Sequence, residues 1–272
     1  MGTPVNPEAL SVLGIPLPAG RTITSDEGDG DERPLWLADV PATAGLWARV
    51  HAEHPRTGLW PLLLAPLEPD DDGLFRPWGS GEVYPEDMSD PAGHDPAGLL
   101  AAWWAAHTAV DADDPLPAAE RAAVTAPFEE WPGLAPGREA AGADRSAAGF
   151  AEAFLAECPS ARLGLVTAAS GAGALAAAGW SGPLNQDDDT GKFSAVVLDW
   201  ERRFGVRVVG VGFATLHLSV AAPPTTPEEA LAVAVEHFAF CPDTVWQGRR
   251  PYTLAAYAGR IVGADRWDFW WD

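Results

Sequence analysis

The segment from residue 193 to 220 changes its hydrophobic period within a few positions. One helical face is apolar and contains Phe193, Val196, Val197, Trp200 and Phe204. Residues 206–211 follow directly and are almost wholly apolar, as in a strand that is covered on both faces. Residues 215–220 then alternate apolar and polar side chains. A helix joined this tightly to two strands predicts an α/β protein with a buried sheet.

The same kind of pattern extends through the C-terminal half of the chain. A helix is expected at residues 147–157, a strand at 163–167 and a short helix after Ser170. Thr226-Pro227-Glu228-Glu229 has the form of a capping box and predicts the start of another helix. A helix at 254–262 and a terminal strand complete the series. The order β, α, α, β, β, α, α, β predicts a mixed β-sheet that is packed by helices on one side.

The N-terminal half predicts a smaller region of the α/β (α+β) class. Residues 1–30 read as an arm, and residues 31–130 contain a βαβ pattern followed by helices. The strands of that pattern, near 35–37 and 59–64, are expected to be parallel. Residues 131–146 are rich in Pro, Gly and Ala and are interpreted as a linker to a C-terminal module at 147–272.

The charge balance is strongly acidic and limits the partners to expect. The chain has 17 basic and 39 acidic residues, so its formal net charge is −22. Such a chain repels nucleic acid and anionic membrane surfaces, and another protein is the partner that we expect instead. The N-terminus lacks the pattern of a signal peptide and no segment is apolar for long enough to cross a bilayer. We therefore expect a cytoplasmic location, and the sequence leaves the oligomeric state open.

The residues that most often hold metals or cofactors are not grouped in this sequence. Cys158 and Cys241 are far apart, and no two histidines have metal-binding spacing together with another ligand. Asn185 and the acidic run at 187–189 offer oxygen atoms but lack the spacing of a calcium loop. Residues 170–176 satisfy a relaxed glycine-rich phosphate pattern, for which a tight turn and a helix cap are the favoured interpretation. No metal and no cofactor are predicted.

Three residues near the end of the 227–240 helix are the candidates for catalysis. His237 and Cys241 are four positions apart, which would let the imidazole activate the thiol, and Asp243 would orient the imidazole. The competing interpretation is a buried cysteine followed by a capping aspartate. With Gln247, these residues define the alternative function, a small-molecule enzyme.

The terminal strand predicts two faces of different character. Alternation places Trp267, Phe269 and Trp271 on one face and Asp268, Trp270 and Asp272 on the other. The first face is expected to join the core. If the second face is uncovered, the polar positions of the 215–220 strand, Thr215, His217 and Ser219, are expected to share it with Trp270.

Several short motifs carry a resemblance to a known family. They are Gly179-Trp180, Asp199-Trp200-Glu201, Arg203-Phe204-Gly205, Ala222-Pro223-Pro224, Cys241-Pro242-Asp243, Gln247-Gly248 and Trp267-Asp268-Phe269-Trp270-Trp271-Asp272. From residue 179 to the end the chain resembles the bacterial family called domain of unknown function 4253, and the N-terminal half looks like its extended actinobacterial-type members. Many relatives continue from Gly-Trp into Asn-Cys-Pro, whereas this chain continues into residues 181–185, so any role of that cysteine is absent. The resemblance implies a shared fold and no particular activity.

The sequence as a whole favours a non-catalytic binding or interaction module, of a regulatory or toxin-neutralising type. The side chains expected to take part in binding are Trp180, Asn185, His217, Gln247, Asp268, Trp270 and Asp272. The alternative remains an enzyme with its site near His237, Cys241, Asp243 and Gln247.

Overall fold

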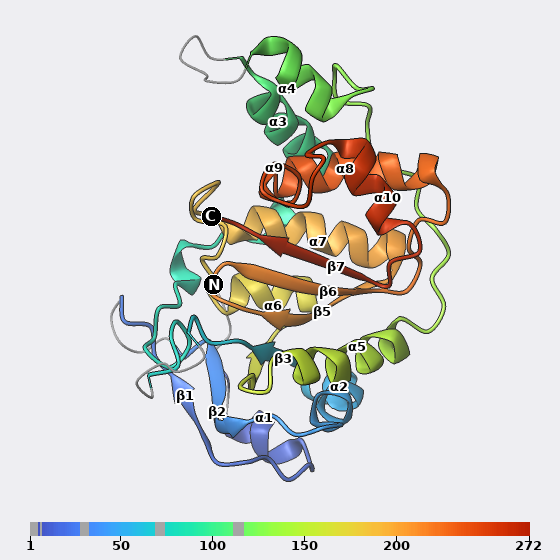
Figure 1. Cartoon of the computed structure of the whole chain (residues 1–272). Coiled ribbons are helices and arrows are strands. Elements are labelled where there is room, and N and C mark those ends of the chain that lie inside the picture. The colour runs from blue at the N-terminus through green and yellow to red at the C-terminus, as the bar shows by residue number, and fades with distance from the viewer. Residues whose placement is uncertain (1–4, 6, 28–32, 69–73, 111–116) are drawn as a thin grey trace.

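The computed structural model describes residue 5 and residues 7–27, 33–68, 74–110 and 117–272. In this part of the chain seven strands form one mixed sheet with the order β1-β2-β4-β3-β5-β6-β7 (Figure 1). The strands are β1 (Gly20–Ile23), β2 (Leu35–Pro41), β3 (Leu59–Leu64), β4 (Arg162–Thr167), β5 (Val206–Val211), β6 (Thr215–Val220) and β7 (Arg266–Trp270). The expected α/β class with a mixed sheet is confirmed.

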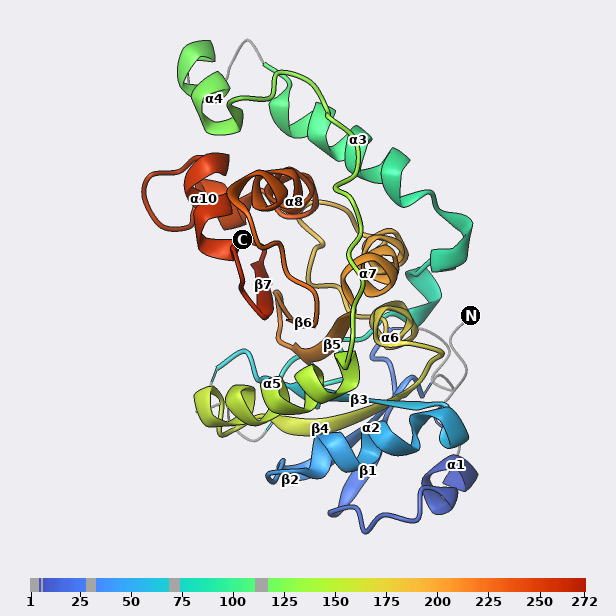
Figure 2. The same cartoon turned by 90° about the vertical axis from the view of Figure 1, so that its right-hand side faces the viewer.

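Helices lie on both faces of the sheet rather than on one side as expected (Figure 2). The helices are α1 (Pro7–Val12), α2 (Leu46–Thr57), α3 (Pro96–Thr108), α4 (Ala118–Thr125), α5 (Ala143–Glu157), α6 (Gly171–Ala177), α7 (Thr190–Phe204), α8 (Pro227–Phe240), α9 (Asp243–Trp246) and α10 (Leu254–Ile261), with short 3-10 turns at Pro85–Asp87 and Pro91–Gly93. Helices α2 and α5 pack on one face, and α6 and α7 pack on the other. The reason is that the central strand β3 is buried at every position, so both of its faces need cover. No helix of the described residues has the length and apolar character needed to cross a bilayer.

Strand β4 occupies a position that the sequence did not predict. It lies between β2 and β3 and is antiparallel to both of them. The expected parallel direction of β2 and β3 is confirmed, because both are antiparallel to β4, but the two strands are not neighbours since β4 lies between them. Since β4 follows residues 131–146 in the chain, the sheet continues across the predicted linker.

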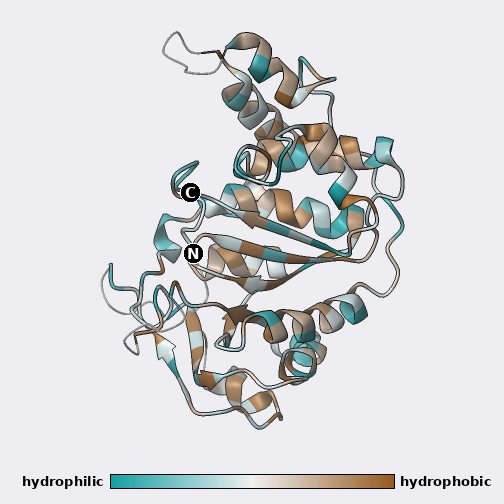
Figure 3. Ribbon diagram, in the orientation of Figure 1, coloured by the Kyte–Doolittle hydropathy of each residue, from teal (hydrophilic) through white to brown (hydrophobic). Residues whose placement is uncertain are grey.

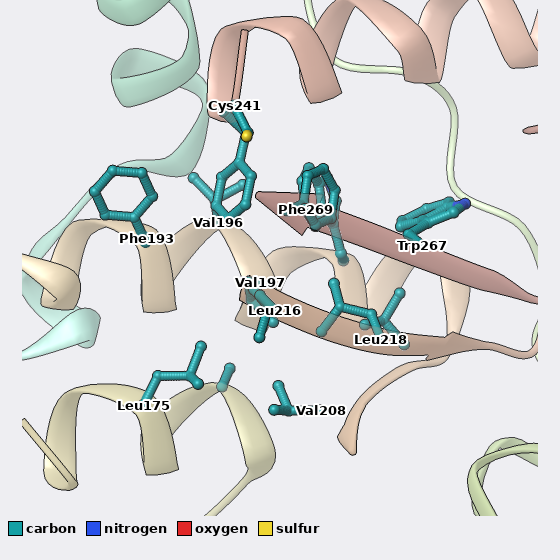
Figure 4. Packing of buried hydrophobic residues seen from close by; sticks show 14 of the residues in the cluster. Leu175, Phe193, Val196, Val197, Val208, Leu216, Leu218, Cys241, Trp267 and Phe269 are labelled. Carbon is teal, nitrogen blue, oxygen red and sulfur yellow. The ribbon is translucent and has the colours of Figure 1, made fainter. Parts of the chain in front are cut away.

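The core between α7, α8 and β7 is rich in aromatic side chains that contact one another. Trp200 of α7 is fully buried, and its ring contacts those of Phe240, Trp267 and Phe269 at centroid distances of 4.8 to 5.5 Å. Figure 4 shows Val196 of α7, Cys241 at the end of α8 and Phe269 of β7 close together in this region. Hydrophobic residues likewise dominate the central strands in Figure 3. The alternation predicted for the terminal strand is confirmed, because Trp267, Phe269 and Trp271 are buried.

A buried carboxylate connects residues 131–142 to this core. Glu236 of α8 is fully buried and accepts hydrogen bonds from Arg203 at 2.6 Å, from the Trp200 indole at 2.7 Å and from the Ala135 backbone at 2.6 Å. A buried ion pair with all its hydrogen bonds satisfied is tolerated, whereas one that loses a partner is costly. These contacts fix the segment around Ala135 along α7 and α8.

Candidate functional site

A cleft of about 540 Å³ opens where α2, α5 and the end of β4 meet. Its walls come from α2, the start of β3, the first turns of α5, the residues after β4, the end of α7 and the start of β5. Apolar surface from Trp60 and several alanines alternates with ionisable side chains. This volume lies in the range of about 300 to 1,000 Å³ that is usual for small-molecule sites.

Glu201 is one of the two carboxyl groups that line this cleft, and Asp144 is the other. The helical phase of α7 that turns Trp200 into the core turns the next residue toward the loop after β4, where the Glu201 carboxylate accepts a hydrogen bond from the Ala172 backbone at 2.9 Å. Burial raises the pKa of Glu201 to about 7, against the opposing effects of that hydrogen bond and of Arg207. The side chain is therefore divided between its acid and its carboxylate at neutral pH.

Two histidines of α2 line the same cleft. The ring of His51 stacks on Trp47 and meets Trp60 edge to face, each at 4.7 Å. Burial lowers the pKa of His51, and within the described residues its Nε2 has no hydrogen-bond partner. His54 instead contacts the Ala168 carbonyl through Nε2 at 2.8 Å. Across the described residues, no group of three His, Cys, Asp or Glu side chains is arranged to hold a metal ion.

Two arginines and one aspartate complete the charges of the cleft. Arg207 of β5 forms an ion pair with Asp144 of α5 at 3.0 Å. Arg145, the next residue on α5, is exposed and has no ion pair within the described part of the chain. One positive charge at the rim of the cleft is thus left without a protein partner.

The glycine-rich turn beside the cleft has the structure expected of a helix cap. The Ser170 side chain accepts a hydrogen bond from the Gly173 backbone and begins α6. A side chain at Gly171 would meet the Trp60 ring at 2.7 Å, so glycine is needed there for packing. The favoured interpretation of residues 170–176, a tight turn with a helix cap, is confirmed.

The three candidates for catalysis do not form a catalytic arrangement. The Cys241 thiol is buried, donates to the Trp270 carbonyl at 2.9 Å and has a pKa that burial raises far above its usual value. His237 hydrogen-bonds the Tyr257 hydroxyl through Nδ1 at 2.9 Å rather than the thiol, and burial lowers its pKa to about 3. A buried, protonated thiol without a neighbouring base is a poor nucleophile.

Four of the sequence candidates, Asp243 among them, meet near residue 272. Asp243 accepts hydrogen bonds from Gln247 and from the Asp272 backbone, and Asn185 donates to the Asp272 carbonyl. Asp243 and Gln247 are therefore occupied by contacts within the α8–α9 turn and with the terminal strand. Trp180 is separate from this group, since it is buried and donates to the Gly212 carbonyl.

The remaining candidates share one face of the sheet, as the alternation predicted. His217 lies opposite Asp268 on the neighbouring strand with 2.7 Å between Nδ1 and Oδ1, and Thr215 lies opposite Trp270. The condition that this face is uncovered is met only in part, because Phe154 of α5 contacts His217 and Ser219 is buried. Trp270, which is 42% exposed, and Asp268 remain open to solvent on this face.

Sequence reasoning did not identify the residues of the cleft as a site. Its polar side chains come from segments as far apart as residues 51 and 207, and no spacing connects them. The one available signal was Glu201, an acidic residue beside a core tryptophan in the motif Asp199-Trp200-Glu201. The family resemblance contained that motif without indicating a role for the carboxylate.

The fold and the cleft define an α/β protein with a mixed sheet and a ligand-sized opening at the end of β4. Residues 162–272 match the family model described as "Domain of unknown function (DUF4253)", which confirms the resemblance for the C-terminal part of the chain. The matched region begins at β4 and contains Ser170, Glu201 and Arg207, whereas the cleft residues of α2 and α5 precede it. No curated protein and no solved structure gives a significant match.

Proposed function

We propose that the protein binds a small polar molecule in the cleft between α2, α5 and β4, and that Glu201 exchanges a proton with the bound molecule. The observation that carries this proposal is a carboxyl group with a pKa of about 7 in the wall of a cleft of ligand size. Perturbed acids of this kind concentrate at functional sites. A group with a pKa near neutrality can both donate and accept a proton under physiological conditions.

A variant that fills the cleft tests this proposal. Ala148 of α5 lines the cleft, whereas Ala153 of the same helix is exposed and lies outside it. Purified wild-type protein, Ala148→Trp and Ala153→Trp should be screened against a library of small polar metabolites by thermal shift. We expect some compounds to raise the melting temperature of the wild type and of Ala153→Trp but not that of Ala148→Trp.

The control variant Ala153→Trp separates filling of the cleft from the general effect of an added tryptophan. Ala153→Trp adds the same aromatic bulk to the same helix, so it should keep the ligand response of the wild type. Compounds that stabilise Ala148→Trp as strongly as the wild type would place binding elsewhere and contradict the proposal.

A second candidate function is binding of a protein partner at the open edge of the terminal strand. It is favoured by the exposed Trp270 indole, which is flanked on its own face by the carboxylates of Asp268 and Asp272. An exposed aromatic ring among carboxylates suits a basic segment, since the ring face and the carboxylates both attract cations. This surface corresponds to the binding or interaction module of regulatory or toxin-neutralising type expected from the sequence.

Partner capture that depends on Trp270 tests this second candidate. Wild-type protein, Trp270→Ala and the surface control Ala153→Trp should be immobilised and exposed to native lysate at low ionic strength. A partner retained by the wild type and the control but lost by Trp270→Ala would support the surface. Retention that is equal in all three proteins would reject it.

A further inference from the structure

The charged and titratable groups around Glu201 come from four elements. Helix α2 contributes His51 and His54, α5 contributes Asp144 and Arg145, and β5 contributes Arg207. On its own helix, Arg202 is exposed, forms an ion pair with Asp199 and favours the ionised form of Glu201 only weakly. Glu201 itself has no ion pair among the residues that the structure describes.

The cleft is an exception in a strongly acidic chain. The charge of Arg207 is balanced by Asp144, burial favours neutral His51, and Arg145 has no ion pair in the described part of the chain. Protonation of Glu201 therefore leaves the cleft with an excess of one positive charge. The chain as a whole has a net charge of −22. Against this background, Arg145 is a local positive charge that can attract an anionic group to the cleft.

We infer that the molecule bound in the cleft is a small organic carboxylate, which pairs with Arg145 and accepts a hydrogen bond from the protonated Glu201. Arginine matches a carboxylate through two parallel N–H donors. A carboxylic acid is the form of Glu201 that can donate to a second carboxylate at close range. The inference rests on the proposed function, since it names the class of molecule that the cleft binds.

Uptake of a proton follows from this arrangement. Two carboxylates that face each other in one cleft cannot both be ionised without strong repulsion, so a bound anion raises the pKa of Glu201 further. At pH 8, where the free protein has mostly lost that proton, binding must recover it from solution. Affinity should then fall about tenfold for each pH unit above 7, because one proton is bound with each anion.

Three compounds of nearly equal size and different charge separate the possibilities. Benzoate, benzamide and benzamidine are an anion, a neutral amide and a cation on the same ring. Each should be titrated into the full chain by calorimetry at pH 6, 7 and 8, in buffers of different ionisation enthalpy. We expect benzoate to bind most tightly, to lose affinity above pH 7 and to take up a proton at pH 8, whereas benzamide binding stays independent of pH.

Two variants assign this behaviour to the named residues. Glu201→Gln keeps a hydrogen-bond donor but cannot titrate, so it should retain benzoate binding and lose the pH dependence. Arg145→Gln should weaken benzoate by about tenfold and leave benzamide unchanged. Arg249→Gln removes one exposed positive charge from the loop between α9 and α10, away from the cleft, and should match the wild type.

The outcomes distinguish this inference from the proposed function. Benzamide or benzamidine binding more tightly than benzoate, with loss of binding in Ala148→Trp, would keep the cleft as a site and overturn the choice of an anion. Benzoate binding without proton uptake would overturn the role of Glu201. Failure of all three compounds to bind at about 10 mM, the affinity expected of fragments this small, would overturn the inference as well.

Discussion

At the scale of single residues, burial decides what each ionisable side chain can do. Desolvation raises the pKa of Glu201 to about 7 and lowers that of His237 to about 3. The first group lines a cleft and keeps access to a ligand, whereas the second is enclosed by aromatic rings and hydrogen-bonded to Tyr257. The pKa of a side chain is thus informative about function only together with its place in the fold.

The raised pKa of Glu201 predicts a specific dependence of stability on pH. An unfolded glutamate loses its proton near pH 4.5, and Glu201 in the folded protein loses it near 7. Between these values the folded state binds more protons, so this group makes the free energy of unfolding fall as pH rises, by about 3 kcal/mol in total. Glu201→Gln should therefore equal the wild type near pH 4.5 and exceed its stability at pH 8.

Urea unfolding of both proteins between pH 4.5 and 8 measures this difference. His237 acts in the opposite direction, because its lowered pKa makes stability rise with pH up to about 6.5, but its contribution is common to both proteins and cancels. A difference that stays constant across this range would show that Glu201 titrates near its ordinary pKa.

At the scale of secondary structure, the last residue of strand β7, Trp270, and the residue after it, Trp271, are tryptophans in different environments. Trp271 is 3% exposed and meets the rings of Trp180, Phe193 and Phe240 at 5.5 to 5.7 Å. Trp270 points to the other face and is 42% exposed. Trp271→Ala should therefore cost about 3 to 5 kcal/mol of unfolding free energy, and Trp270→Ala less than about 1 kcal/mol. Chemical denaturation of both variants is the measurement, and similar losses would contradict the assignment of faces.

Local sequence patterns predicted several helices and strands correctly, because the formation of a helix or strand depends largely on the side chains within it. The helical face of α7, the capping box at Thr226 and the alternation of β7 are all present in the structure. The cleft could not be predicted in the same way. It is assembled from residues that lie far apart in the chain, and the burial that shifts the pKa of Glu201 exists only after β4, α5 and α7 have packed together.

At the scale of the whole molecule, the sheet joins the two halves of the chain. Strand order was not predictable from local pattern, because pairing of β4 with β2 and β3 is decided by contacts over more than 90 residues of sequence separation. Residues 131–146 resemble a linker in composition, yet Ala135 is buried and bonded to Glu236. Composition alone therefore predicts a domain boundary at residues 131–146, although a single sheet contains strands from both sides of it.

A fragment experiment tests this continuity. In the isolated fragment 147–272 strand β4 would lack both of its neighbours, and β5 would lose the partner strand β3. We expect this fragment to be unfolded by near-ultraviolet circular dichroism and to regain a folded spectrum when fragment 1–146 is added. A cooperative thermal transition of fragment 147–272 alone would show that the C-terminal half is an independent module.

The raised pKa of Glu201 depends on the packing of α7 against the loop after β4. It depends also on a cleft to which both halves of the chain contribute residues. Titration of Glu201 by ¹³C NMR of the side-chain carboxyl carbon, assigned by comparison with Glu201→Gln, is the most direct test. We predict a midpoint near pH 7 in the folded full-length protein. A midpoint near 4.5, the ordinary value of a solvated glutamate, would contradict the proposed role of the cleft.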